Sequence, residues 1–328
     1  MPLDWAPFVE IIRRHQRFLL TTHIRPDGDG LGSMQALAGV LGSLGKEAQR
    51  VIASPLPERY ISLDPEKRIE PFAPPGERWG TAEVVIVLDT GTWNQLGSFG
   101  PFLRSLPAAK VVIDHHQTQD DLGALRFVDV TAEATGRLVF EAITALGVPL
   151  PVAAANDLFV AVAMDTGWFR HSNATAATFD LEAELVRAGA RPDRIYEQLF
   201  ERSTLPRLKL TGRVLDRLEV THGGRVAYTE VRLADYQATS AMPQDTEELV
   251  NYTLSLAGVK VGLLFMEQPR GGVKVSFRSR SRVDVARLAE RFGGGGHRLA
   301  SGASLETTLE DARQRVLEAV YAAVDAAG

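Results

Sequence analysis

The chain has 328 residues, of which 45% are hydrophobic and 23% charged, a balance typical of a globular protein large enough for two domains. It contains no cysteine, so disulfides, thiolate metal sites and cysteine nucleophiles are excluded, and any metal ion must be held by oxygen and imidazole ligands. The net charge of −5 argues against a protein that coats long nucleic-acid duplexes.

No stretch of the sequence approaches the ~20 consecutive apolar residues of a membrane span. The segment that begins at Met1 has no basic start followed by an apolar block, as a signal peptide would have. We therefore expect a cytoplasmic protein that makes no membrane contact.

The first half of the chain alternates short apolar runs with helical patterns. We expect strands at 17–22, 48–53, 83–88 and 110–113, and helices at 5–14, 34–41, 134–146 and 152–164. Residues 54–80 are rich in proline and charge and are expected to be loop with little regular structure. The alternation predicts an α/β domain whose mostly parallel, doubly wound sheet carries helices on both faces.

Acidic and histidine side chains follow the ends of these elements, where open α/β sheets bind their ligands. They are His23, Asp27, Asp29, Asp89, Asp114, His115, His116 and Asp165. Each acid alone has an ordinary explanation, because Asp-Gly pairs are common in turns and an aspartate can simply end an element. Several such ends in one sheet instead predict a single cluster on one side of the domain.

The cluster has the ligand chemistry of Mn²⁺ or Mg²⁺. Five carboxylates this close would repel one another without cations. Two cations about 3.5–4 Å apart would neutralise them and clamp an in-line phosphoryl displacement, with an ionised bridging water as nucleophile.

The second half of the chain begins with expected helices at 174–188 and 193–202. Strands are then expected at 226–231, 259–266 and 272–278, and helices at 247–256, 283–292 and 311–327. This pattern predicts a smaller C-terminal α/β domain. The expected division is a catalytic domain at 1–192, a helical connector at 193–213 and a substrate-binding domain at 214–328.

The C-terminal domain also contains the best candidates for binding phosphate. Between Pro269 and Gly302 there are eight Lys or Arg residues against two acids. Four glycines at 293–296 precede His297 and could be a flexible linker, but a helical segment directly before them favours a fixed loop whose N–H groups bind an anion. Arg278 and Ser279 are the next candidates, since arginine suits a bidentate phosphate contact.

The motifs His23-x-x-Pro26-Asp27-x-Asp29, Asp89, Asp114-His115-His116 and Asp165 resemble the four ordered motifs of the DHH phosphoesterase family. The segment 292–297 with Ala300-Ser301-Gly302 resembles the glycine-rich signature of the DHH-associated C-terminal domain. The resemblance spans nearly the whole chain. In length and second domain the chain is similar to the NrnA-type members, which act as nanoRNases on very short oligoribonucleotides and as phosphatases on 3′-phosphoadenosine 5′-phosphate (pAp).

The resemblance implies a role for each residue of the cluster. One ion would be held by His23, Asp27 and Asp89, and the other by Asp29, Asp89, His115 and Asp165, with Asp89 bridging. His116 would face the scissile phosphate as a donor and complete the catalytic set with Asp89 and His115, while Asp114 would orient a histidine. In an interdomain cleft, the substrate's terminal phosphate or nucleotide would meet Gly294, Gly295, Gly296 and His297.

The implied activity is that of an Mn²⁺-dependent phosphoesterase, with Mg²⁺ or Co²⁺ as substitutes, that cuts by a two-metal-activated water. Its expected substrates are short single-stranded RNA or DNA oligomers, cut to 5′-mononucleotides, or pAp, cut to AMP. A phosphodiesterase of cyclic or linear dinucleotides is the alternative. The glycine loop argues against a pyrophosphatase-like phosphoanhydride hydrolase, and the complete ligand set argues against a dinucleotide sensor without catalysis. Homodimerisation is left open.

Overall fold

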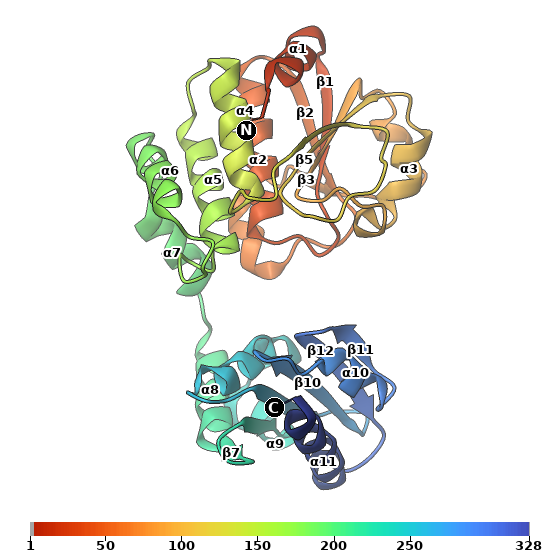
Figure 1. Cartoon of the computed structure of the whole chain (residues 1–328), viewed down its shortest axis with the longest axis vertical. Helices are drawn as coiled ribbons and strands as arrows, with labels where there is room; N and C mark the ends of the chain where they lie inside the picture. Colours follow the sequence, from red (N-terminus) through yellow and green to blue (C-terminus); the bar gives the residue numbers. More distant parts are fainter. Residues whose placement is uncertain (1–2, 328) are drawn as a thin grey trace. The chain divides into compact units, whose positions relative to one another are not determined.

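The structure is a computed structural model that describes residues 3–327. The chain divides into two compact units, of which the first ends at Arg202 and the second begins at Ser203 (Figure 1). The segment expected as a connector contains parts of two helices, α7 (Pro192–Phe200) and α8 (Leu205–Asp216), and the units divide between them.

The first unit is built on a six-stranded sheet in which every neighbouring pair is parallel, in the order β3-β2-β1-β4-β5-β6. The strands are β1 (Arg17–Thr21), β2 (Glu47–Ile52), β3 (Ile69–Pro71), β4 (Val84–Leu88), β5 (Ala109–Asp114) and β6 (Leu125–Val128). The predicted doubly wound sheet is confirmed. Its strand order reverses between β1 and β4, and the crevice beyond the carboxyl ends of such a pair is where these sheets bind ligands.

Helices cover both faces of this sheet (Figure 1). One face packs against α1 (Ala6–Arg14), α2 (Gly28–Ser43) and α4 (Thr135–Leu146), and the other against α3 (Phe99–Ser105). Helix α5 (Val152–Asp165) packs on α2 and α4. Successive residues of β4 enter the two cores in turn, Ile86 on the α2 side and Val87 on the α3 side. All five residues of β4 are buried, which explains its uninterrupted apolar sequence.

Residues 54–80 contain little regular structure, as expected, namely the short strand β3 and the 3₁₀ helices η1 (Glu58–Leu63) and η2 (Glu77–Trp79). One expectation for this unit is wrong. Helix α2 begins at Gly28 rather than near residue 34, because the Asp27 side chain caps it by accepting hydrogen bonds from the backbone N–H of Asp29 and Gly30. The cap moves Asp29 from a loop into the first turn of a helix.

The second, smaller unit contains a mixed sheet, also of six strands, in the order β11-β12-β10-β9-β8-β7, which confirms the predicted smaller α/β part. Its strands are β7 (Glu219–Thr221), β8 (Val226–Val231), β9 (Val261–Glu267), β10 (Val273–Ser279), β11 (Gly295–His297) and β12 (Ala300–Leu305). Its helices after α8 are α9 (Leu233–Thr239), η4 (Pro243–Thr246), η5 (Leu249–Ser255), α10 (Val285–Glu290) and α11 (Leu309–Ala327). The helix expected at 247–256 is thus the 3₁₀ helix η5, and the expected loop at 293–297 includes β11. Within residues 3–327, no helix is both long and apolar enough to cross a membrane.

Glu182 in α6 (Ala176–Arg187) gives a prediction about stability. Its carboxylate is buried, neither oxygen has a hydrogen-bond partner in the described structure, and burial raises its pKa to about 9. The folded protein therefore keeps this proton up to about pH 9, whereas the unfolded chain releases it near 4.5. The contribution of Glu182 to the free energy of unfolding is therefore fully present below pH 4.5 and is progressively lost as the pH rises from there toward 9.

We expect Glu182→Gln to raise the Tm by several degrees at pH 8. Keeping the wild-type carboxyl protonated at this pH costs the folded state on the order of a few kcal/mol, and glutamine does not ionise. At pH 4, where the wild-type carboxyl is protonated in both states, the Tm should be nearly unchanged. Thermal denaturation followed by circular dichroism at both pH values measures this, with the exposed Glu184→Gln as the control on the same helix. Equal Tm changes in Glu182→Gln and Glu184→Gln would contradict the raised pKa of Glu182.

Candidate metal centre

The loop after β1 and the start of α2 supply the first three side chains of the site. His23 follows the central strand, Asp27 caps α2, and Asp29 lies in the first helical turn. The Nε2 atom of His23 lies 3.6 Å from Asp27 Oδ1. Gly30 allows α2 to start so close to the sheet, because a Cβ atom there would lie 2.3 Å from Thr22 Oγ1 and 3.3 Å from Asp89 Oδ2.

Asp89 directly follows β4 and lies between two histidines. Its Oδ2 atom is 3.4 Å from His23 Nε2, and its Oδ1 atom is 3.7 Å from His115 Nε2. The residue has a φ of +62°, a left-handed conformation that aspartate tolerates better than most side chains. The two carboxylate oxygens therefore face opposite halves of the cluster.

The two histidines beside Asp89 are held in one tautomer. His23 Nδ1 donates to the Ile24 carbonyl at 3.0 Å, and His115 Nδ1 donates to the Ala132 carbonyl at 3.1 Å. A carbonyl can only accept, so the proton of each neutral ring is on Nδ1 and its Nε2 is directed at the carboxylates. Burial lowers the pKa of His23, but the hydrogen bonds and charges of Asp27 and Asp89 outweigh it and raise the pKa to about 10, so a metal ion bound there would take the place of the Nε2 proton. Histidines fixed through Nδ1 with Nε2 directed at carboxylates are typical of metal ligands.

His115 also links β5 to the ends of two helices. Its Nε2 atom lies 3.7 Å from Asp29 Oδ2 and 3.7 Å from Asp165 Oδ2, where Asp165 is the last residue of α5. Ligand atoms lie within 4.8 Å of one another in three groups of side chains, which are His23–Asp27–Asp89, Asp29–His115–Asp165 and Asp89–His115–His116. The first group is the set expected on one ion, and the second contains three of the four residues expected on the other. The fourth, Asp89, belongs to the first group and has its Oδ1 beside His115 of the second.

The carboxylates of this cluster are crowded, and those of Asp29 and Asp89 are almost completely removed from water. Burial raises the pKa of Asp29 well above its ordinary value, and the charges of Asp89 and Asp165 raise it further. Burial likewise raises the pKa of Asp89 and brings that of Asp165 to about 6. A bound cation would remove this electrostatic cost, so the donor set and its charge both fit a divalent metal.

His116 and Asp114 form a pair beside the cluster. The buried Asp114 carboxylate accepts hydrogen bonds from His116 Nδ1 at 2.8 Å and from the His116 backbone N–H at 3.1 Å. Gln119 donates to its second oxygen. The hydrogen bond that Nδ1 donates to Asp114 raises the pKa of His116 to about 9, so the ring is a cation with its Nε2–H left for another acceptor.

The site opens on the side of Asp27 and His116. Their side chains are 54% and 55% exposed, whereas those of Asp29 and Asp89 are 1% and 2% exposed. A hollow of about 580 Å³ lies on this side. Besides cluster residues it is lined by polar side chains, among them Thr90, Thr92, Asn94, Gln95, Gln117, Thr118 and Asp120.

Sequence reasoning missed the contribution of helix α4. The backbone N–H groups of Thr135 and Gly136 donate to the two Asp29 oxygens at 2.6 and 2.9 Å, and Thr135 Oγ1 donates to Asp89 Oδ1 at 2.9 Å. The N-terminus of α4 therefore orients two of the buried carboxylates. The only signal in the sequence is a Thr-Gly pair at the start of a helical pattern, which is too common to identify a site.

The candidate phosphate-binding residues of the second unit lie on adjacent strands. Ala300 of β12 is paired with Arg278 of β10 on one side and with His297 of β11 on the other. Directly paired residues point to the same face, so Arg278 and His297 flank a small alanine. Phe277, on the opposite face, is in the core against α10 and α11, so the row lies on the other face of the sheet.

Two details differ from the expected anion loop. The N–H groups of Gly293 and Gly294 donate to the carbonyls of Glu290 and Ala289, so they end helix α10 instead of lining a nest for an anion. Gly294 has no room for a side chain, since a Cβ atom would lie 2.1 Å from the Gly302 carbonyl oxygen. Ser279 is buried on the opposite face from Arg278, and its hydroxyl is paired with that of Ser281.

Two family models match the chain. The DHH family, N-terminal domain, matches residues 17–163, and the DHHA1 domain matches residues 223–326. The fold is thus that of a known class, and the chain belongs to the DHH family of metal-dependent phosphoesterases.

Among the relatives of known description, the bifunctional oligoribonuclease and PAP phosphatase NrnA of Thermus thermophilus is 31% identical over 94% of this chain and 90% of its own length. The protein of the same description from Bacillus subtilis is 26% identical over 90% of this chain and 92% of its own. The crystal structure of an exopolyphosphatase-related protein from Bacteroides fragilis has a TM-score of 0.84 and 25% identity, covering 96% of this chain and 94% of that one.

Proposed function

We propose that the protein hydrolyses short oligonucleotides to 5′-mononucleotides and pAp to AMP, using two divalent ions, Mn²⁺ above all. The observation that carries the proposal is the position of Asp89, whose two oxygens face two separate histidine-containing ligand groups. The relatives described as oligoribonuclease and PAP phosphatase, similar over nearly the whole chain, support the choice of substrates.

In this proposal His23, Asp27 and Asp89 hold one ion, and Asp29, Asp89, His115 and Asp165 hold the other. The ions would supply Lewis-acid activation of water and neutralise the phosphate. His116 donates from Nε2 to a phosphate oxygen or to the leaving oxygen, since Nδ1 is fixed by Asp114. Helix α4 and Thr135 keep the carboxylates in position as charge changes during the reaction.

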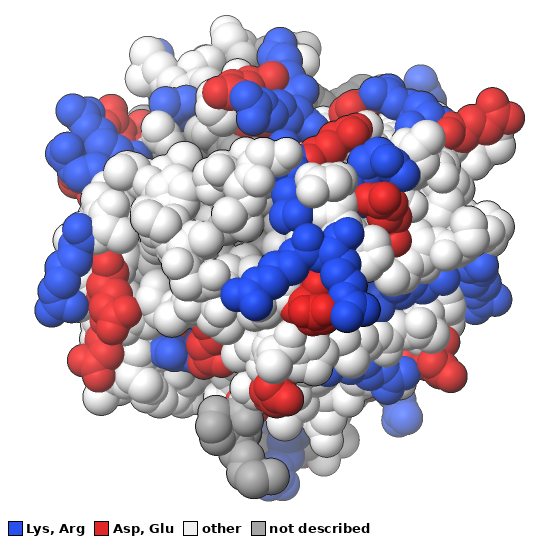
Figure 2. Space-filling view, turned by 90° about the horizontal axis from the view of Figure 1, so that it is seen from above, with Lys and Arg blue, Asp and Glu red and all other residues white. Residues whose placement is uncertain are grey.

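The second unit would bind the far end of the substrate. Arg278 and His297 flank the small residue Ala300, and neighbouring positions of this face hold Gly295 and Gly302, so a phosphate or nucleotide can approach the backbone closely. Long polymers would need a continuous basic track. The face of the first unit that Figure 2 shows carries basic side chains interspersed with acidic ones and with uncharged surface, so that face has no continuous basic track.

The test is a substrate panel with Mn²⁺ and the whole chain. We expect rapid hydrolysis of pAp and of RNA oligomers of a few nucleotides, and slow hydrolysis of long strands and of pyrophosphate. End-labelled RNA and DNA ladders, from dinucleotides to long strands, measure length limit, polarity and sugar preference together. Cleavage of the longest strands as fast as of short oligomers would contradict the short-substrate proposal. Hydrolysis of pyrophosphate but of no phosphoester would mean that the substrate is a phosphoanhydride.

Arg278→Gln tests the part assigned to the second unit. We expect the KM for a trinucleotide to rise by about tenfold with little change in kcat, because a charge-assisted contact to a remote phosphate is lost in ground state and transition state alike. The matched control is Arg280→Gln, whose exposed side chain we interpret as solvated. If both variants keep the wild-type KM, the substrate end is bound elsewhere.

A further inference from the structure

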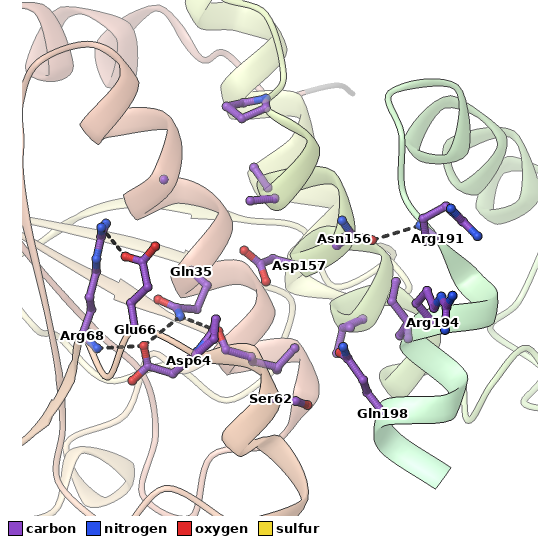
Figure 3. A pocket seen from close by; sticks show the side chains of 18 of the residues that line it. Gln35, Ser62, Asp64, Glu66, Arg68, Asn156, Asp157, Arg191, Arg194 and Gln198 are labelled. Carbon is purple, nitrogen blue, oxygen red and sulfur yellow. Dashed lines mark hydrogen bonds and ion pairs between the residues drawn. The ribbon is translucent and has the colours of Figure 1, made fainter. Parts of the chain in front are cut away.

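A second hollow of about 580 Å³ lies in the first unit and shares no residue with the metal centre. Its walls come from α2, β2, η1 and the turn after it, α5 and α7 (Figure 3). The volume is in the range of small-molecule sites, which run from roughly 300 to 1,000 Å³. Neither the family motifs nor the proposed reaction uses these residues.

Three buried polar atoms on the walls have no hydrogen-bond partner within residues 3–327. They are Gln35 Oε1, Arg50 Nε and Ser62 Oγ. Gln35 is 9% exposed, and its amide nitrogen is already bound to the Leu63 carbonyl at 2.6 Å, which leaves the oxygen as a fixed acceptor. All three are closed off from solvent, so a ligand hydroxyl would reach them after a small side-chain rotation. The hydrogen bond formed there would satisfy a group that is costly to leave buried without a partner.

The charged side chains around the hollow favour an anion. Four arginines line it against three acids, and Arg68, Arg191 and Arg194 are ion-paired with acids. Arg50 has no ion pair in the described part of the chain. Burial and the charge of Arg68 lower its pKa, and the nearby carboxylates of Asp64, Asp157 and Glu66 offset this only in part. An anionic ligand group would add to this counter-charge.

Asp157 projects from α5 toward the α2 side of the hollow (Figure 3). In the described structure nothing donates a hydrogen bond to its carboxylate, and burial raises its pKa to about 8. At neutral pH the group therefore carries a proton and can donate to an anion. The remaining wall is mixed. Leu63, Ala154, Val160, Ile195 and Leu199 are apolar, whereas Ser43, Asn156, Gln198 and the carboxylates of Asp64 and Glu66 are polar.

We propose that this hollow binds a small phosphate ester with free hydroxyl groups, a sugar or nucleoside monophosphate. The phosphate would meet Arg50, with Arg194 of α7 at the rim. Ligand hydroxyls would donate to Gln35 Oε1 and pair with Ser62 Oγ, and the apolar part of the wall would face the rest of the ligand. Inorganic phosphate has the charge but not the hydroxyls, so it should bind more weakly.

The experiment measures binding to the whole chain in EDTA at pH 7, so that no metal ion recruits phosphate and no turnover is needed. Calorimetry with ribose 5-phosphate, AMP, inorganic phosphate and ribose shows which part of the ligand, the phosphate, the sugar or the base, is needed for binding. We expect ribose 5-phosphate or AMP to bind at least about tenfold more tightly than phosphate, and ribose not to bind. Whichever ester binds more tightly identifies the ligand as a sugar or a nucleoside monophosphate.

Variants decide whether that binding is in this hollow. Arg50→Gln should weaken the tighter ester by about tenfold or more. Arg194→Gln, whose side chain is 66% exposed and whose loss should not affect folding, should weaken it by about threefold. Arg187→Gln, on the exposed side of α6, is the matched control and should bind as the wild type.

Asp157→Asn gives a change in the opposite direction. At pH 9 it removes a negative charge that faces the ligand, so the ester should bind more tightly than to the wild type, which mere loosening of the hollow would not produce. The proposal would be overturned if no ester bound. It would also be overturned if Arg50→Gln, Arg194→Gln and Arg187→Gln bound the ester with equal affinity, because the binding would then lie outside this hollow. Because no activity is measured, this outcome is independent of the proposed reaction.

Discussion

Asp89→Asn should lower kcat/KM for pAp and for a trinucleotide by about 10³-fold or more. The asparagine keeps the shape of the side chain but replaces one of the two charged oxygens by an amide, so the two ligand groups lose their common carboxylate. Metal-ion stabilisation of the transition state contributes several kcal/mol, and each 1.4 kcal/mol is about tenfold in rate.

The variant should remain folded. Asparagine tolerates the left-handed conformation found at Asp89, where alanine would be strained. Burial already raises the pKa of the Asp89 carboxyl group, so removing its charge should not lower the stability of the metal-free protein. The control is Asp121→Asn, whose side chain is 91% exposed. Wild-type turnover by Asp89→Asn, with folding verified by circular dichroism, would mean that Asp89 does not bridge two ions.

The sheet of the first unit could be predicted from the sequence because its signals are local. Continuous apolar runs such as β4 arise when a strand is buried on both faces, and an acid or histidine at the end of such a run is placed by the strand itself. Asp89 and His115 follow adjacent strands β4 and β5, so predicting the strands was enough to bring them together.

Other parts of the site depend on contacts that are distant in sequence. Thr135 and Gly136 reach Asp29 across more than 100 residues, and no local pattern specifies which helix start lies against which carboxylate. Strand β11 was not predicted, because its glycines have little intrinsic strand preference and are held by pairing with β12. Ser279 looked equivalent to Arg278, but alternation along β10 places it on the core face.

Divalent metal should stabilise the first unit by a large and reversible amount. In the metal-free protein, buried Asp29 and Asp89 face each other with raised pKa values, so part of the folding free energy is lost to their proximity. An ion that binds only the folded state at 100 times its Kd adds about 2.7 kcal/mol, which for a unit of this size is a Tm increase of roughly 5–10 °C.

Two ions per chain are expected, because the cluster offers two ligand groups around Asp89. Equilibrium dialysis with Mn²⁺ should give a stoichiometry of two for the wild type and one for His23→Asn, which loses an imidazole from one group and leaves Asp29, His115 and Asp165 intact. EDTA should reverse the Tm increase in both proteins, and the increase should be smaller in the variant. A wild-type stoichiometry of one would leave only a single-ion site, and an unchanged Tm with Mn²⁺ would mean that these carboxylates do not hold a metal.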